Sequence, residues 1–180
     1  MEKIILIGIP NAGKSTLGRL AAHKLNLPFY DTDTLITERL KSDKLIDYLK
    51  MAFNGQFIYT QKRIMFELSH LKGPAIISTG AEVALIPECA ALMKKMGKVI
   101  HIKRKLKFAL ADARLNSKNT IVMKRNGIEV DMQKEGLDLY MEEYSQYEKI
   151  ADLNLNNNGT EHEGLEKLTS MITATSKISF

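Results

Sequence analysis

Lys3-Ile4-Ile5-Leu6-Ile7-Gly8-Ile9-Pro10-Asn11-Ala12-Gly13-Lys14-Ser15-Thr16 is the stretch that decides the fold of this chain. An apolar run leads into Gly8, and Gly13-Lys14-Ser15 follows after four further residues. This is the G-x-x-x-x-G-K-[ST] pattern of a phosphate-binding loop set between a strand and a helix. Glycine leaves room for backbone N–H groups to wrap a polyphosphate, and the following helix directs its positive end toward it. A plain glycine turn would explain the two glycines alone, but the complete pattern favours nucleotide binding.

The loop predicts two cofactors, ATP and Mg²⁺. We expect Lys14 to reach the β- and γ-phosphates and to act in catalysis, and we expect the Ser15 hydroxyl to bind Mg²⁺. The residues of this stretch that we expect to bind the nucleotide are Gly8, Asn11, Ala12, Gly13, Lys14, Ser15 and Thr16.

Length and composition indicate a single globular domain over residues 1–180. The chain is 44% hydrophobic and 26% charged, and it has no apolar run long enough to span a membrane. Its first residues form the strand and the loop rather than a cleavable signal. Cys89 is the only cysteine, which excludes an internal disulfide and fits a reducing compartment. We therefore expect a cytoplasmic protein, and a packing role for Cys89.

The net charge of +5 is unevenly distributed, since Asp112 is the only acidic residue between Lys94 and Arg125. A basic stretch is one feature of nucleic-acid binding. Here, however, Phe108 is the only aromatic residue in the stretch, and phosphate handling also needs cations. We expect the partners to be a nucleotide and a small-molecule acceptor, with no nucleic acid and no membrane, in a monomer or weak homodimer.

Apolar strand-like runs alternate with helical periods along the chain, which indicates an α/β domain with a mainly parallel sheet. Strands are expected at 3–8, 29–31, 75–78, 98–103 and 151–155. Helices are expected at 14–25, 34–41, 43–51, 56–71, 87–96, 105–117 and 134–150, and a last one begins at Thr160. Residues 118–133 lack a steady period and are expected to form a mobile loop or lid. Ligands of such sheets bind at the carboxyl ends of the strands. That rule brings together Gly8–Ser15, Asp31–Asp33 and Ser78–Glu82.

Four segments occur in one order at a familiar spacing: the phosphate-binding loop, Tyr30-Asp31-Thr32-Asp33, Ser78-Thr79-Gly80 and Tyr147-x-x-x-Ala151-Asp152. Together they resemble the shikimate kinase family of small P-loop kinases, over nearly the whole chain. The resemblance implies a three-layer P-loop kinase fold with a parallel five-stranded sheet and helices on both faces. It also implies a lid at about 112–130 that covers ATP, and a separate acceptor-binding region.

The resemblance also implies roles for individual residues. Asp31 resembles the aspartate that lies near Mg²⁺ and acts through water, and Asp33 resembles the carboxylate that binds the acceptor hydroxyl and helps accept its proton. Asp33 could also cap the following helix, and both roles can coexist. Ser78 and Thr79 would lie beside Mg²⁺ or simply end a strand. Arg114 resembles the arginine near the adenine, although a solvent-facing arginine is the alternative.

The sequence departs from the family in its acceptor region. Gly80 is followed by Ala81 and Glu82 where the family has three glycines. In the motif Gly-Glu-x-x-Phe-Arg, an ungapped alignment to 55–60 puts Thr60 in place of the arginine. Glu143 takes the place of a second carboxylate-binding arginine, and Asn119-Thr120-Ile121-Val122 replaces the lid pattern Arg-Pro-Leu-Leu. The cations that could compensate are Arg63, Lys118, Lys124 and Arg125.

These departures lead to a hypothesis about the acceptor, whose site we expect to contain Asp33, Thr60, Gly80, Ala81, Glu82 and Glu143. Neither threonine nor glutamate can replace the charge-assisted pair that arginine forms with a carboxylate. The sequence therefore predicts ATP-dependent phosphorylation of a hydroxyl on a neutral or cationic metabolite. The alternatives are a true shikimate kinase with compensating arginines, a non-catalytic ATP-binding regulatory protein, and a kinase linked to nucleic acid.

Overall fold

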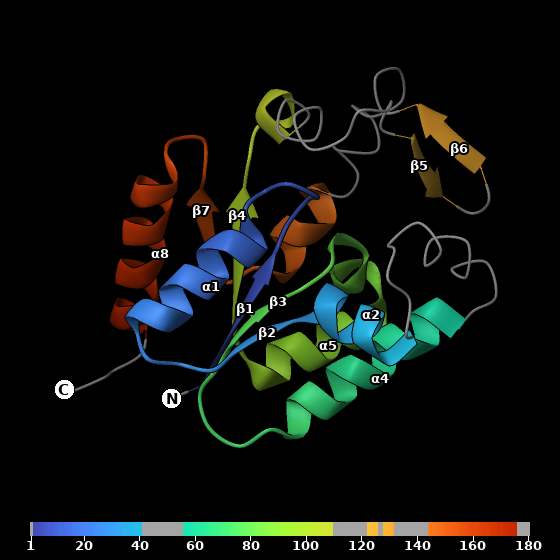
Figure 1. Ribbon diagram of the computed structural model, residues 1–180, viewed down its shortest axis with the longest axis horizontal. Coiled ribbons are helices and arrows are strands. Elements are labelled where there is room, and N and C mark those ends of the chain that lie inside the picture. Colours follow the sequence, from blue (N-terminus) through green and yellow to red (C-terminus); the bar gives the residue numbers. More distant parts are fainter. Residues whose placement is uncertain (1, 41–55, 110–121, 126–127, 132–143, 176–180) are drawn as a thin grey trace.

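A five-stranded parallel sheet forms the centre of the computed structural model (Figure 1). The structure describes residues 2–40, 56–109, 122–125, 128–131 and 144–175. The strands are β1 (Lys3–Ile7), β2 (Phe29–Asp31), β3 (Ile76–Ser78), β4 (Gly97–Lys103) and β7 (Leu153–Asn156), in the spatial order β2-β3-β1-β4-β7. All pairs in this sheet are parallel. The predicted α/β fold is confirmed.

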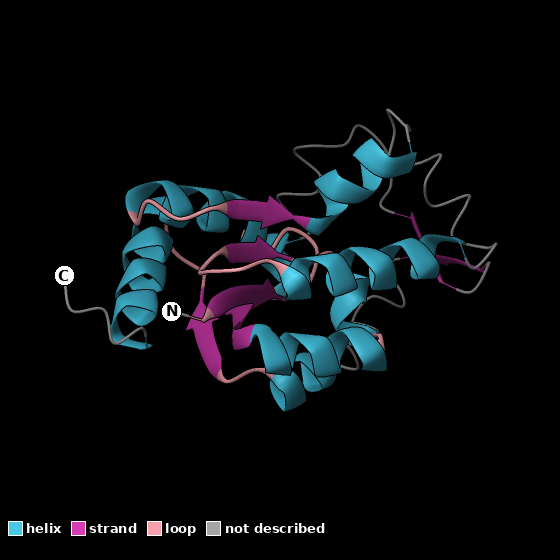
Figure 2. Ribbon diagram, turned by 90° about the horizontal axis from the view of Figure 1, so that it is seen from below, coloured by secondary structure: helices cyan, strands magenta, loops and turns pink. Residues whose placement is uncertain are grey.

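Helices cover both faces of the sheet (Figures 1 and 2). The elements are α1 (Lys14–Lys24), α2 (Thr32–Leu40), α4 (Gln56–His70), the 3₁₀ turn η2 (Ala81–Leu85), α5 (Pro87–Met96) and α8 (Glu161–Thr175). Residues 106–109 and 144–150 are also helical. Helices α1 and α8 pack on each other, and so do α4 and α5. Right-handed crossovers put α1 on one face and α4, α5 and 144–150 on the other.

The central strand β1 is fully buried, which explains its continuous apolar sequence. Ile5, Leu6 and Ile7 have 0% exposure, because β3 and β4 flank β1 within the sheet and helices cover both of its faces. The register pairs Ile5 with Ile77 and with Val99. The end of β1 is therefore fixed from four sides, and so is the point from which the phosphate-binding loop begins.

Two boundaries illustrate how local sequence shapes the chain. The last helix, which was expected to begin at Thr160, starts with a capping box: Thr160 Oγ1 accepts from the Glu163 N–H at 3.2 Å, and Glu163 Oε2 accepts from the Thr160 N–H at 3.1 Å. Gly97 caps the carboxyl end of α5 and is also the first residue of β4, where it pairs with Lys3.

Part of the stretch 118–133, which was expected to form a mobile loop or lid, has regular structure, and its role as a lid stays a prediction. Strands β5 (Val122–Arg125) and β6 (Ile128–Asp131) form an antiparallel pair in which Arg125 lies opposite Ile128. The Asn126-Gly127 dipeptide between them is the strongest short signal for a two-residue hairpin turn. Several predicted segments lie outside the described residues. They are the helix at 43–51, most of the helix at 105–117, and the lid residues 112–121 with Lys118.

Truncation of the central strand tests this architecture. We expect Ile5→Ala to lower the free energy of unfolding by roughly 2–5 kcal/mol, because it leaves a cavity among residues that cannot collapse onto it. Urea denaturation followed by circular dichroism measures the change. Ile58→Ala is the matched control, since Ile58 is 45% exposed on α4. Equal losses in the two variants would contradict the burial of β1.

Candidate active site

The phosphate-binding loop leaves the sheet through backbone conformations that favour glycine and asparagine. Gly8 has φ +143°, Asn11 +57° and Gly13 +94°. A Cβ on Gly8 would lie 2.6 Å from the Ile102 carbonyl oxygen, so the loop passes directly against β4. Gly8 thus meets both requirements inferred from the sequence, a close backbone approach and an unusual backbone angle.

The Lys14 side chain lies within the loop that precedes it. Its Nζ donates hydrogen bonds to the carbonyl oxygens of Gly8 and Ile9, each at 2.8 Å, and the residue is 8% exposed. Lys14 opens α1, whose N-cap is Gly13. A cation therefore stands at the N-terminus of a helix, where unpaired backbone N–H groups also point, and such a site binds anions.

The ends of β2 and β3 bring further polar groups to this edge of the sheet. The hydroxyl oxygens of Ser15 and Ser78 lie 3.3 Å apart. The Thr32 hydroxyl oxygen accepts the Gly80 N–H at 2.8 Å, which joins the start of α2 to the segment after β3. Thr79 instead donates its hydroxyl to the Leu6 carbonyl at 3.1 Å and so secures a strand end. The three segments that were predicted to meet at this edge, Gly8–Ser15, Asp31–Asp33 and Ser78–Glu82, therefore do lie together.

The two aspartates after β2 have different environments. Asp31 Oδ1 accepts the N–H groups of Asp33 at 3.0 Å and Thr34 at 3.4 Å, so Asp31 caps α2. The alternative in which Asp33 caps that helix is therefore wrong, since Asp33 lies in its first turn. The Asp33 carboxylate instead faces Gly80, where an added Cβ would collide with Oδ1. A glycine at position 80 thus makes room for Asp33.

The protonation of Asp33 is perturbed by the same surroundings. Asp33 remains open to solvent, but the protein approaches its carboxyl group closely. Desolvation, and then the charge of Asp31, raise the pKa of Asp33, while Lys14 lowers it by a smaller amount. A raised pKa makes this carboxylate a better proton acceptor.

The remaining predicted acceptor residues are more scattered. Ala81 begins η2, and its carbonyl accepts the Tyr147 hydroxyl at 3.1 Å. Glu82 follows in the same turn and is partly exposed. Thr60 is 6% exposed and lies in the buried stripe of α4 with Phe57 and Ile64. Arg114 and Glu143 lie outside the described residues, and their predicted roles stay predictions.

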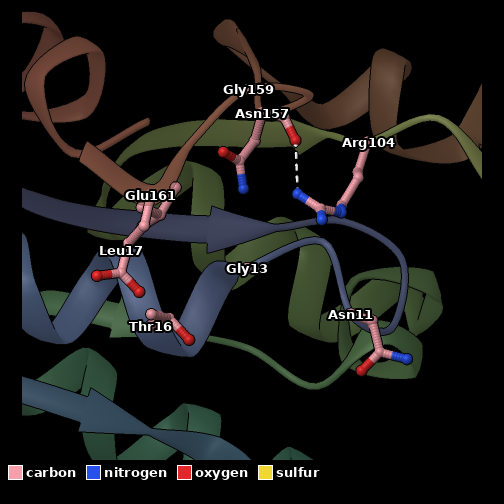
Figure 3. Close-up of a pocket in the computed structure, with 8 residues that line it drawn as sticks. All are labelled: Asn11, Gly13, Thr16, Leu17, Arg104, Asn157, Gly159 and Glu161. Carbon is pink, nitrogen blue, oxygen red and sulfur yellow. Dashed lines mark hydrogen bonds between the residues drawn. The ribbon is translucent and has the colours of Figure 1, made fainter. Parts of the chain in front are cut away.

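A pocket beside the loop contains two residues that sequence reasoning missed, Arg104 and Asn157 (Figure 3). The pocket is lined by Asn11, Gly13, Thr16, Leu17, Arg104, Asn157, Gly159 and Glu161. Arg104 Nη1 donates to the Asn157 carbonyl at 2.9 Å, and Asn157 Nδ2 donates to the Ala12 carbonyl at 2.8 Å. In the sequence, Asn157 lies in the asparagine-rich stretch 156–159, which indicates only a loop, and Arg104 lies in the basic stretch from Lys94 to Arg125. Neither pattern indicates a contact with residue 12.

The geometry agrees with what the chain matches among known proteins. Residues 10–173 match the family model described as shikimate kinase. The chain belongs to the shikimate kinase family. The shikimate kinase of Francisella tularensis subsp. novicida is 30% identical over 161 residues, 88% of this chain and 86% of that protein. That of Caldicellulosiruptor saccharolyticus is 34% identical over 128 residues, 71% of this chain and 72% of that protein. The match to the Enterococcus faecalis enzyme, at 35% identity, spans 57% of this chain and 59% of that protein.

Solved structures show the same fold. A shikimate kinase from Acinetobacter baumannii in complex with shikimate aligns with a TM-score of 0.78 at 19% identity, over 98% of this chain and 95% of that one. The enzyme from Aquifex aeolicus aligns with a TM-score of 0.72 at 22% identity, over 97% of this chain and 98% of that one. As a family member, the chain is a P-loop kinase that binds ATP and transfers a phosphoryl group to a hydroxyl of a small molecule.

Other candidate sites contribute little. Among the residues that the structure describes, no group of three or more His, Cys, Asp or Glu side chains could hold a metal ion. Within the same ranges, no helix combines the length and apolar character needed to cross a bilayer. Cys89 is buried, and burial raises the pKa of its thiol to about 11, which disfavours a nucleophilic thiolate.

The raised pKa of Asp33 predicts the acid limb of the pH profile. Only the ionised carboxylate can accept a proton, so kcat/KM should fall as the pH drops through the pKa of Asp33. That limb should lie above the ordinary aspartate value of 3.8. The measurement is kcat/KM for the best acceptor against pH. His101, whose pKa burial lowers to about 4, is the control: His101→Phe should keep the limb. A limb at or below 3.8 would contradict the assignment.

Proposed function

We propose that this kinase phosphorylates a hydroxyl of a small metabolite by direct transfer from Mg-ATP, with Asp33 as the proton acceptor. The observation that carries the proposal is the position of the Asp33 carboxylate. It stands against Gly80 at the same sheet edge as Lys14 and Ser15. In phosphoryl transfer the protein mainly positions groups and stabilises negative charge, and a carboxylate aligns the attacking hydroxyl.

The donor set at this edge fits Mg²⁺. Magnesium prefers hard oxygen ligands and keeps several of its waters. The Ser15 and Ser78 hydroxyls and the Asp31 carboxylate, which caps the neighbouring helix, supply such oxygens. When bound, the ion would neutralise phosphate charge. The protein would supply the other groups needed for transfer: Lys14 would hold the phosphates, and Asp33 would orient the alcohol and accept its proton.

The pocket at Arg104 and Asn157 suits the nucleoside part of ATP. It adjoins Gly13 and Thr16, so a phosphate chain seated in the loop would lead directly into it. Arg104 provides a cation at its wall, held by a main-chain carbonyl. The predicted adenine contact of Arg114 remains part of this proposal.

The acceptor itself is proposed to be neutral or cationic. In the ungapped alignment Thr60 takes the place of the arginine of Gly-Glu-x-x-Phe-Arg. Thr60 is 6% exposed in the buried stripe of α4, and it carries no charge that could pair with a carboxylate.

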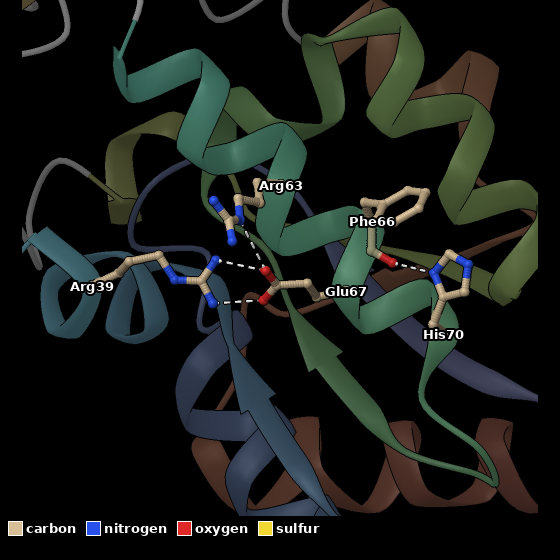
Figure 4. A network of polar contacts seen from close by, with 5 residues as sticks. All are labelled: Arg39, Arg63, Phe66, Glu67 and His70. Carbon is tan, nitrogen blue, oxygen red and sulfur yellow. Dashed lines mark hydrogen bonds and ion pairs between the residues drawn. The ribbon is translucent and has the colours of Figure 1, made fainter.

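The two cations nearest in sequence to that position, Lys62 and Arg63, are engaged elsewhere. Lys62 Nζ donates to Glu88 Oε1 at 2.7 Å. Arg63 Nε donates to Glu67 Oε1 at 3.2 Å, and Arg39 holds both oxygens of the same carboxylate at 3.1 and 2.6 Å (Figure 4). Arg63 is 61% exposed in its side chain. Recruiting it to an acceptor would require separation from Glu67. This supports an acceptor site without a strong carboxylate anchor.

Phosphorylation of shikimate itself is the second candidate. The relatives that cover most of the chain are shikimate kinases, and one neighbouring structure was solved with shikimate. Under this alternative Lys118, Lys124 or Arg125 would supply the missing positive charge.

A substrate comparison separates the two candidates. We expect purified protein with Mg-ATP to release ADP faster with a neutral or amino-substituted polyol than with shikimate. ADP release in a coupled assay is the measurement, with each acceptor at the same concentration. Efficient turnover of shikimate would contradict the proposed acceptor class. ATP binding without turnover of any acceptor would instead favour a regulatory protein.

Replacement of Asp33 tests the catalytic assignment. We expect Asp33→Asn to lower kcat by roughly 10²–10⁴-fold, because the amide cannot accept the proton. The dissociation constant of ADP should change little. Glu38→Gln, an exposed change on the same helix α2, is the matched control and should keep wild-type turnover. If D33N retained full activity, another proton acceptor would have to be sought.

A further inference from the structure

Asn157 occupies an unusually constrained position between the phosphate-binding loop and α8. It is 5% exposed. A Cβ on Gly13 would lie 2.6 Å from its Nδ2 atom, and a Cβ on Gly164 would lie 2.6 Å from its Oδ1 atom. Glycines on two separate elements therefore leave the space that this amide fills. Its backbone is fixed as well, since its N–H donates to the Lys103 carbonyl at 2.7 Å.

The hydrogen bond from Asn157 to Ala12 controls the direction of a peptide group in the loop. The Ala12 carbonyl accepts from Nδ2 at 2.8 Å, so it points toward Asn157. In a trans peptide the carbonyl and the following N–H point in opposite directions. The Gly13 N–H is therefore directed away from Asn157. Because Gly13 is in the left-handed region, where glycine is freely adaptable, the local backbone alone does not enforce this direction.

We propose that Asn157 is a positioning residue that holds the Ala12–Gly13 peptide with its N–H toward the phosphates and its carbonyl away from them. A flip of this peptide would remove one donor from the anion site and turn a carbonyl dipole toward the phosphate charge. The main-chain carbonyl of Asn157 accepts Arg104 Nη1, so this one residue orders the loop through its side chain and a wall of the neighbouring pocket through its backbone. The inference rests on nucleotide binding by the family and is independent of the acceptor.

Asn157→Asp removes the donor with almost no change in shape. The carboxylate would face the Ala12 carbonyl, and the two acceptors would repel each other. We expect the dissociation constant of ADP, measured by titration calorimetry, to rise roughly tenfold or more. Asn158→Asp is the control, because it adds the same charge one residue away and keeps the oxygen that accepts the Lys105 N–H. It should leave ADP affinity within about twofold of wild type.

A second variant reaches the same peptide from the opposite side. In the variant Gly164→Ala, the new Cβ would clash with Asn157 Oδ1 and displace the amide from the Ala12 carbonyl. This change on α8 should therefore weaken ADP binding by roughly fivefold or more. In an Asn157→Ala background the amide is gone, and G164A should cost much less. Leu168→Ala, on the same helix with 0% exposure, should lower the unfolding temperature without weakening ADP binding.

The ADP affinities of these variants decide whether Asn157 positions the peptide. The positioning role is supported if ADP affinity falls in N157D and G164A but not in the controls, and if G164A has a smaller effect once Asn157 has been replaced by alanine. Wild-type ADP affinity in N157D would overturn it. The proposal would also be overturned if the loss of ADP affinity followed the drop in unfolding temperature across all variants, L168A included. Asn157 would then act only through the stability of the whole fold.

Discussion

The close approach of Gly8 to β4 is the constraint on which the rest of this structure depends. The backbone can turn out of the sheet there because no side chain separates it from the Ile102 carbonyl. Burial of β1 on all sides fixes where that turn begins. The N–H groups of the loop that follows, together with the start of α1, provide much of the positive potential that binds phosphate.

The polar groups of the site follow from the parallel sheet. Strands β1, β2 and β3 all end at one edge, so residues far apart in sequence meet there without a dedicated local motif. The polar side chains at that edge have different roles. Asp31 and Thr79 form hydrogen bonds with the backbone at the start of a helix and at the end of a strand, whereas the Asp33 carboxylate faces Gly80. A small difference in helix start, at Thr32, decides which aspartate caps and which can act on a substrate.

Sequence patterns predicted the sheet, the loop and the meeting of its three polar segments, because each depends on local periodicity or on a strand end. They failed where a contact joins distant positions. The bond from Asn157 to Ala12 spans 145 residues, and no local pattern announces it. The antiparallel pair of β5 and β6 was not predicted, because residues 118–133 lack a steady period and Asn126-Gly127 indicates only a turn. In α4 the alignment with the family motif gave Thr60 a place in the acceptor site, but it did not show that Thr60 is buried in the same stripe as Phe57.

The proposed transfer of a phosphoryl group from ATP to the acceptor hydroxyl takes place in the space between Lys14 and Asp33. The most direct test is a crystal structure of the protein with ADP, Mg²⁺ and aluminium fluoride, which mimics the phosphoryl group in transfer. We predict that the fluoride group lies between Lys14 Nζ and the Asp33 carboxylate, with Mg²⁺ on the Ser15 hydroxyl. A nucleotide bound elsewhere, or an Asp33 side chain turned away from the fluoride, would contradict the account.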